Sequence, residues 1–235
     1  MEPEAAGLKR VLSHSRRVRA TEARQWAWEI GEIRIVVDIS GIGRDRCRRT
    51  TNKLIDQGAS WIVCAGFAAA LDDKARAGDI VVVDRVMHAR RAASPISCSG
   101  ALVAAIPPSG RLGYTIWRSD MVTCDAMVLR ASAKKDIYGS TGAASLDMEA
   151  HATADVCDQR GVPFAVVKGI SDTADQDLPE EVQSLALSRS WAERLGIIIG
   201  RPGMWPDLWR LRKSTALASN NLGDVLGTML LRLFT

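Results

Sequence analysis

Short runs of consecutive apolar residues recur along the chain, and longer segments with helical spacing of apolar positions separate them. The runs are bounded by Gly, Pro, Asp or Ser and are too short for helices, so they predict buried strands. The strands expected on this basis cover residues 33–39, 61–65, 79–84 and 163–170, with a shorter one at 114–117.

Helical spacing is found between most of these strands. It predicts helices over residues 5–12, 44–57, 127–138 and 147–160. Residues 89–113 are rich in Ser, Pro and Gly and are expected to form a loop. Strands that alternate with helices indicate an α/β fold with a largely parallel sheet, in which ligands bind beyond the carboxyl ends of the strands.

The pattern changes near residue 200. We expect one domain over residues 1–200 and an amphipathic C-terminal appendage over residues 201–235. Trp205 and Trp209 are four residues apart and share one helical face, with Arg210, Arg212 and Lys213 around it. Trp with Arg suits a membrane–water interface, so the appendage is a candidate for peripheral membrane contact. The alternative is a helix that packs on its own chain or on a second subunit.

Composition, net charge and cysteine spacing argue against several classes of function. The chain has 235 residues, of which 47% are hydrophobic, and a formal net charge of +4, which is too weak to indicate a nucleic-acid partner. Five cysteines are widely spaced without a CxxC pair, so neither a zinc site nor a disulfide framework is expected. No signal peptide or long apolar run is present, which favours a cytoplasmic protein with reduced thiols. We expect no metal and no cofactor.

Two acidic motifs stand where chemistry is expected. Residues 145–150 read Ser-Leu-Asp-Met-Glu-Ala at the start of a predicted helix, and residues 169–175 read Gly-Ile-Ser-Asp-Thr-Ala-Asp after a predicted strand. A single Asp after a strand is usually a helix cap, and a single Glu in a helix usually lies on the surface. The two motifs in this order make Asp172 and Glu149 the best candidates for a catalytic pair.

The ordered pair of motifs resembles the purine nucleoside phosphorylase/uridine phosphorylase superfamily. The resemblance is strongest to methylthioadenosine/S-adenosylhomocysteine nucleosidases and hopanoid-associated phosphorylases, and it covers roughly residues 1–180. Further parts of the family pattern are matched by residues 40–43, 64–71 and 76–82. The resemblance implies a three-layer αβα fold around a twisted mixed sheet, and cleavage of the bond between a purine and a ribose in a small-molecule nucleoside.

The resemblance also implies a role for individual residues. Asp172 matches the acid that protonates the purine N7, which is worth roughly 10²–10⁴-fold in rate. Glu149 matches the residue that accepts hydrogen bonds from the ribose hydroxyls. Met148 matches the side chain beneath the sugar, and Ser171 is expected to support Asp172. The remaining candidates are pocket residues and a weaker phosphate ligand: Gly66, Phe67, Phe164 and Arg44.

Glu4 aligns with the family's water-activating Glu, which follows the first strand of the sheet. No stretch before Glu4 corresponds to that strand. We expect either that the true start lies upstream and encodes it, or that the protein lacks a central strand, which would leave ladder groups unpaired.

Departures from the family pattern bear on the substrate. Phe67 replaces a small residue, Val122 replaces an aromatic that stacks on adenine, and Cys64 takes the place of the phosphate-binding Arg of hexameric phosphorylases. Hydrolysis is therefore slightly favoured over phosphorolysis, and the expected substrate is an adenine nucleoside modified at the 5′ position, which in the hopanoid-associated group carries a lipid. A homo-oligomer is expected.

Three rival readings remain. The first is a non-catalytic nucleoside-binding relative of the same fold, which the bulk of Phe67 and the missing strand would suit. The second is an oxidoreductase with a dinucleotide-binding fold, although no GxGxxG follows a strand. The third is a nucleic-acid module, for which no recognition motif is present.

Overall fold

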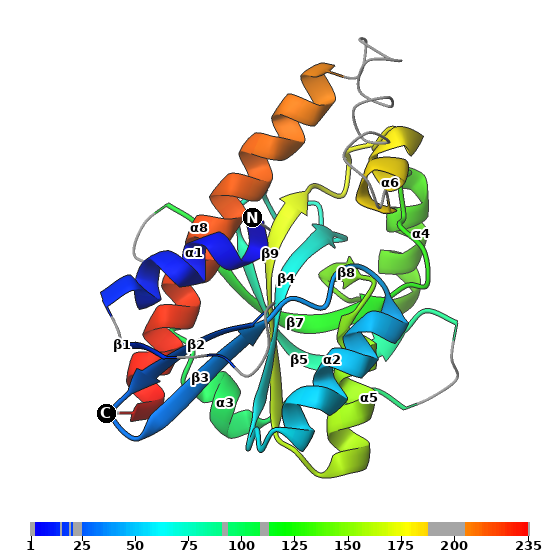
Figure 1. The fold of residues 1–235 in the computed structure, drawn as a ribbon. Helices are drawn as coiled ribbons and strands as arrows, with labels where there is room; N and C mark the ends of the chain where they lie inside the picture. The colour runs from blue at the N-terminus through cyan, green and yellow to red at the C-terminus, as the bar shows by residue number, and fades with distance from the viewer. Residues whose placement is uncertain are drawn as a thin grey trace.

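A computed structural model describes residues 3–14, 16–18, 20, 25–90, 94–108, 113–187 and 205–234, and these form two sheets with helices around them (Figure 1). The small sheet is antiparallel and consists of β1 (Arg16–Val18), β2 (Gln25–Ile30) and β3 (Ile33–Asp38). The large sheet is the core of the fold. Its strands are β4 (Ile62–Ala70), β5 (Ile80–His88), β6 (Ile96–Ser97), β7 (Ile116–Thr123), β8 (Ser145–Asp147) and β9 (Phe164–Asp172).

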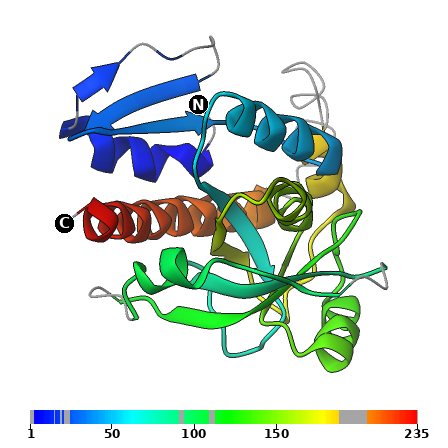
Figure 2. The same ribbon diagram turned by 90° about the horizontal axis from the view of Figure 1, so that it is seen from below.

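Helices cover both faces of the large sheet (Figures 1 and 2). One face carries α2 (Arg44–Asp56) and α5 (Ala150–Arg160), and the other carries α1 (Pro3–Val11), α3 (Gly100–Ala104) and α8 (Trp205–Phe234). Two further helices, α4 (Ala131–Thr141) and α6 (Glu180–Leu187), flank the end at which β9 finishes, and a short 3-10 turn, Leu12–His14, follows α1. The arrangement confirms the three-layer α/β fold.

The central strands are built on runs of apolar residues because both of their faces are buried. Along β5 and β9, Val81 and Val166 pack in the cluster that includes residues of α2 and α5. Ile80 and Val167 point the other way, into the cluster that includes residues of α8. The continuous apolar runs of the sequence therefore supply two layers of core, one on each side of the sheet.

The large sheet is mixed, as expected. Its order is β6-β5-β7-β8-β4-β9, and β9 also pairs with β5. The β4–β9, β5–β7 and β7–β8 pairs are parallel, whereas β4–β8 and β5–β9 are antiparallel. Strand β8 pairs with β4 at two residues, Ala69 and Ala70. Among the described residues, the rest of β4, residues 62–68, pairs with one strand, β9.

Three expectations about individual elements are wrong. Strand β7 is longer than residues 114–117, because polar residues in its middle lie on the half-exposed part of the strand and interrupt the apolar run. The region 89–113 contains β6 and α3. The segment expected to begin a helix at Asp147 first forms β8, and α5 begins at Ala150.

The C-terminal helix α8 has two different halves. From Ala218 to Leu230 most of its residues are buried, and Gly169 of β9 allows the close approach, since a Cβ there would lie 2.9 Å from that of Ala218. This half is part of the core, which the amphipathic pattern alone did not indicate. The first half extends past the sheet at the end where β9 finishes, and Trp209 is 67% exposed (Figure 1). In the described residues, no helix combines the length and hydropathy needed to cross a membrane.

Candidate active site

The two acidic motifs lie on either side of the end of β4. In the sheet register, Ala69 pairs with Leu146 of β8 on one side and with Asp172 of β9 on the other. Adjacent strands lie about 4.8 Å apart, so the two motifs are separated by roughly 10 Å. The fold therefore brings together at one edge of the sheet two segments that are distant in the sequence.

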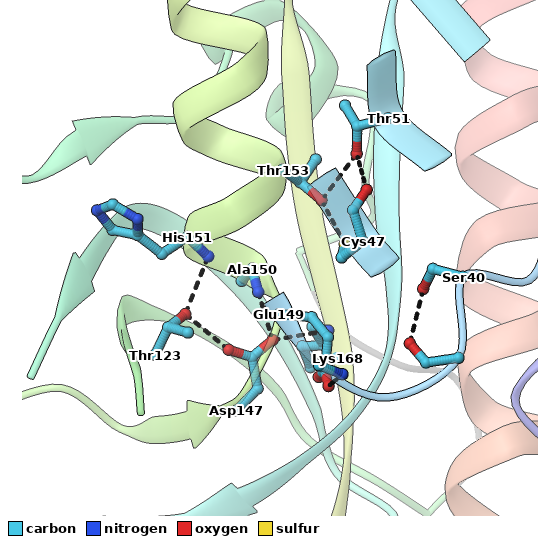
Figure 3. Close-up of polar contacts among 12 residues, drawn as sticks. Ser40, Cys47, Thr51, Thr123, Asp147, Glu149, Ala150, His151, Thr153 and Lys168 are labelled. Atoms are coloured by element: carbon cyan, nitrogen blue, oxygen red, sulfur yellow. Dashed lines mark hydrogen bonds and ion pairs between the residues drawn. The ribbon is translucent and has the colours of Figure 1, made fainter. Parts of the chain in front are cut away.

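A buried ion pair forms the floor of the site on the β8 side. Lys168 Nζ lies 2.9 Å from Asp147 Oδ2, and the two side chains are 3% and 1% exposed. The same carboxylate accepts hydrogen bonds from the Thr123 hydroxyl at 2.8 Å and from the Ala150 amide at 2.9 Å (Figure 3). Burial opposes the charge on Lys168, but neighbouring Asp147, Cys64 and Glu149 raise its pKa well above the usual value. Lys168 is therefore held as a cation within the core.

Glu149 occupies the N-cap position of α5, next to this ion pair. Its Oε1 accepts a hydrogen bond from the Gly43 amide at 2.9 Å, at the glycine turn that opens α2. Gly43 adopts φ 107°, a conformation that favours glycine and aims the amide toward the site. Burial, followed by repulsion from Asp147, raises the pKa of Glu149 to about 7, although Lys168 and the Gly43 amide act in the opposite direction.

This pKa predicts a pH dependence of ligand binding. Below pH 7 Glu149 is largely protonated, and it gains its full capacity as an acceptor only as the pH rises through about 7. Affinity for a ligand with a vicinal diol is therefore expected to increase over this interval. Titration calorimetry at several pH values would measure the increase, and Glu149→Gln should flatten it. A flat profile in the unmodified chain would contradict the assignment.

A second buried ion pair holds Asp172 on the opposite side of β4. Lys134 of α4 is fully buried, and its Nζ lies 2.7 Å from Asp172 Oδ2. The same ammonium donates to the carbonyl oxygens of Thr173 at 2.8 Å and Gln176 at 3.1 Å, which fixes the chain that leaves β9. The Ser171 hydroxyl donates to Asp172 Oδ1 at 2.7 Å. Both carboxylate oxygens are thus engaged, and the orientation of the side chain is set on two sides.

The other predicted residues divide into two groups. Gly66 lies beside Lys168, since a Cβ at Gly66 would be 3.4 Å from Nζ, while Phe67 and Met148 are half-buried near the same end of the sheet. Phe164, in contrast, begins β9, eight residues from Asp172 and therefore roughly 26 Å away. It is 4% exposed and packs in the core, so the structure does not bring it to the site.

Two candidates belong to the helices near the site. Arg44 is the first residue of α2 and follows Gly43 directly. Glu4 belongs to α1, and the position of its side chain is outside the described residues. Among the residues that the structure describes, no group of three or more His, Cys, Asp or Glu side chains could hold a metal ion.

Sequence reasoning missed three residues that organise the site: Asp147, Lys168 and Lys134. Lys168 could have been found from the sequence, because it is the single charged residue within the apolar run 164–170. A lysine in a doubly buried strand requires a partner. Lys134 had no such signal, since a lysine in the first turn of a helix usually lies on the surface.

Comparisons with known proteins agree with this fold. A 5′-methylthioadenosine/S-adenosylhomocysteine nucleosidase of Shewanella putrefaciens is 27% identical over 221 residues, covering 85% of this chain and 94% of the relative. The crystal structure of such a nucleosidase from Colwellia psychrerythraea, in complex with adenine, matches with a TM-score of 0.76 at 20% identity, over 99% of this chain and 92% of that one. The futalosine hydrolase of Helicobacter pylori matches with a TM-score of 0.74 at 17% identity, over 98% and 94% of the two chains.

A family comparison covers the site as well as the fold. The family model of the Phosphorylase superfamily matches residues 1–199, which include both acidic motifs and both buried lysines. The motifs, the mixed sheet and this match agree, and the chain belongs to the Phosphorylase superfamily.

Proposed function

We propose that the chain cleaves the N-glycosidic bond of an adenine nucleoside with a modified 5′ position and releases the base. The observation that carries the proposal is the placement of Asp172 on one side of the end of β4 and of β8, which leads to Glu149, on the other. A separation of roughly 10 Å between these two strands suits two groups that act on the two ends of one nucleoside. The relatives support the choice of substrate, because several are named for 5′-methylthioadenosine and one is bound to adenine.

Asp172 is the proposed acid. A purine leaves as a neutral molecule once N7 is protonated, and a carboxylic acid positioned beside the base can supply the proton. Lys134 and Ser171 hold the carboxyl group in place. The Lys134 ammonium lies beside the carboxylate that forms as the proton passes from Asp172 to N7, and it stabilises the negative charge left behind.

Glu149 is the proposed ribose ligand. A carboxylate has acceptor sites on both oxygens and can bind two neighbouring hydroxyls. Gly43 leaves one oxygen partly available, and the Lys168–Asp147 pair beneath keeps the region polar. Met148, Gly66 and Phe67 would line the space between sugar and base.

Replacing Glu149 with Gln is expected to weaken nucleoside binding roughly tenfold to a hundredfold, since hydrogen bonds to a charged group are worth about 1.5–3 kcal/mol. The loss should be much smaller for a 2′,3′-dideoxy analogue, which has no diol. Glu180→Gln, an exposed change on α6, is the matched control. Equal losses on both ligands would assign Glu149 a structural role.

The proposed nucleophile is water, with Glu4 as the base that activates it. Support comes from the relatives, which are named as nucleosidases and a hydrolase. Phosphorolysis, a glycosyl transfer to phosphate, is the alternative, and Arg44 beside the Gly43 turn is its candidate ligand.

A panel of adenosines with different 5′ substituents, each incubated with and without phosphate, tests this function. Release of adenine without phosphate supports hydrolysis, and release that requires phosphate supports the alternative. Binding without release of base from any of these adenosines would favour the rival reading, a non-catalytic nucleoside-binding relative.

We also propose that the first half of α8 contacts an anionic membrane surface, in a cytoplasmic protein. Trp209 is 67% exposed and lies near Arg212 and Lys213, both also exposed, and the Lys213 ammonium lies 5.6 Å from the Trp209 ring centre. This half of α8 extends past the sheet at the same end as Asp172 (Figure 1). A lipid-linked nucleoside, as in the hopanoid-associated group that the sequence resembles, would then reach the site from the bilayer.

The membrane proposal predicts co-sedimentation of the full chain with vesicles containing phosphatidylglycerol. Trp209→Ser combined with Arg212→Glu is expected to abolish it. Point changes are preferable to truncation, because the second half of α8 belongs to the core. Leu231→Ser, which alters an equally exposed apolar residue at the other end of α8, is the control. Unmodified protein that stays in the supernatant would contradict the proposal.

The expected homo-oligomer is a separate proposal, for which we favour a homodimer. Light scattering coupled to size-exclusion chromatography measures the mass directly, and a monomer at micromolar concentration would contradict it.

A further inference from the structure

Thr123 is the last residue of β7 and lies beside the buried ion pair of the site. The parallel register of β7 and β8 pairs Thr123 with Asp147, and each of the two residues is 4% exposed. The Thr123 hydroxyl donates to Asp147 Oδ1 at 2.8 Å and accepts a hydrogen bond from the His151 amide at 2.9 Å (Figure 3). One hydroxyl therefore connects the end of β8 with the first turn of α5.

The two carboxylate oxygens of Asp147 have different partners. Oδ2 lies 2.9 Å from Lys168 Nζ and accepts from the Ala150 amide at 2.9 Å. Within the described part of the chain, the Thr123 hydroxyl is the one hydrogen-bond donor to Oδ1. Loss of this donor would leave a buried carboxylate oxygen without a partner, which is costly. The carboxylate could then regain a partner only by turning, and turning would weaken the contact of Oδ2 with Ala150.

Glu149 lies between the two residues that this contact joins. The bond from the Ala150 amide to the Asp147 carboxylate spans the backbone of Glu149 at the start of α5. The Glu149 side chain is held separately, by the Gly43 amide at 2.9 Å. A change in the orientation of Asp147 therefore moves the backbone of Glu149 relative to the Gly43 turn.

We propose that Thr123 is a positioning residue for ribose binding: its hydroxyl fixes Asp147, and Asp147 fixes the segment from which Glu149 reaches the sugar. The inference rests on the proposed function, because it assigns Thr123 to the ribose side of that site. Thr123→Val tests it, since Val has a similar shape but lacks the hydroxyl, so both hydrogen bonds of Thr123 are lost.

The first measurement follows the Gly43 amide of the ligand-free chain by nuclear magnetic resonance. An amide proton donated to a carboxylate resonates downfield, so the Gly43 signal is expected to move upfield in Thr123→Val as its contact with Glu149 weakens. Thr123→Ser, which keeps the hydroxyl, should leave the signal in place. Thr141→Val is the matched control, because the Thr141 hydroxyl also donates one hydrogen bond and accepts one. An unchanged Gly43 signal in Thr123→Val would overturn the proposal.

Steady-state kinetics with an adenine nucleoside separates positioning from general destabilisation. Thr123→Val is expected to raise KM roughly tenfold, the effect of weakening one hydrogen bond to a charged group. It should leave kcat within about twofold, because the ground state and the transition state lose the same ribose contact. Thr123→Cys, whose thiol is a weaker donor, should give an intermediate KM, and Thr123→Ser should restore the original one.

The opposite kinetic pattern would also overturn the proposal. A smaller folded fraction lowers kcat at unchanged KM, and a general disturbance of the site weakens the binding of a 2′,3′-dideoxy analogue as much as that of the nucleoside. Either result in Thr123→Val would assign its hydroxyl a structural role alone. A chain that releases no base would contradict the proposed function, and the Gly43 signal, which needs no ligand, would then decide the role of Thr123.

Discussion

Replacing Asp172 with Asn is expected to lower the turnover of an adenine nucleoside by roughly 10²–10⁴-fold. Asn has nearly the same shape and can keep the contact with Lys134, but it has no carboxyl proton to donate to N7. The fold should remain, because the Asn oxygen can still accept from the Lys134 ammonium, which also donates to the Thr173 and Gln176 carbonyl oxygens. Steady-state kinetics of base release together with a thermal melt would measure both effects.

The control for this substitution lies three residues further along the chain. Asp175→Asn removes an exposed carboxylate from the same segment and should leave kcat within about twofold of the unmodified value, as surface changes usually do. Unchanged kcat in the Asp172→Asn variant would remove the proposed acid from the mechanism.

Replacing Lys168 with Met is expected to lower the free energy of unfolding by about 3–5 kcal/mol. The substitution leaves the Asp147 carboxylate, 1% exposed, without its cation, and a buried unpaired charge is costly. Urea denaturation followed by circular dichroism would measure the change. Lys168→Arg, which keeps the charge, should recover part of it.

Lys135→Met is the comparison for the Lys168 variant. It makes the same chemical change at an exposed position of α4 and should alter the free energy of unfolding by less than about 0.5 kcal/mol. A loss of unfolding free energy below about 1 kcal/mol in Lys168→Met would lie in the range of an exposed ion pair. It would show that the Lys168–Asp147 pair does not stabilise this side of the site.

The sequence predicted the elements that are buried on both faces. Strands β4, β5 and β9 were found because each begins with a run of apolar residues, over residues 62–65, 80–83 and 164–167. Strand β8 was missed because three residues are too few to form a pattern, and they lead directly into α5. The pattern over residues 201–235 left both interpretations of α8 open, since an amphipathic helix has the same pattern whether its apolar face meets a membrane or a sheet.

The site residues that could be predicted from the sequence are those that a short motif marks. Asp172 and Glu149 were found from short ordered motifs, and the register around Ala69 explains why they lie close together. Phe164 was predicted to line the pocket, but it begins β9 and Asp172 ends it, so the length of a nine-residue strand separates the two residues. Lys134 reaches Asp172 from a different helix, and such a contact depends on tertiary packing that no local pattern encodes.

One measurement tests the central claim most directly: mass-spectrometric analysis of a single reaction between the unmodified chain and 5′-methylthioadenosine. Cleavage of the N-glycosidic bond predicts that free adenine and the 5′-modified ribose, or its 1-phosphate when phosphate is present, accumulate in equal amounts, and that Asp172→Asn suppresses both. Recovery of the intact nucleoside after prolonged incubation, under conditions where calorimetry shows that it binds, would contradict the claim and identify a nucleoside-binding protein without this activity.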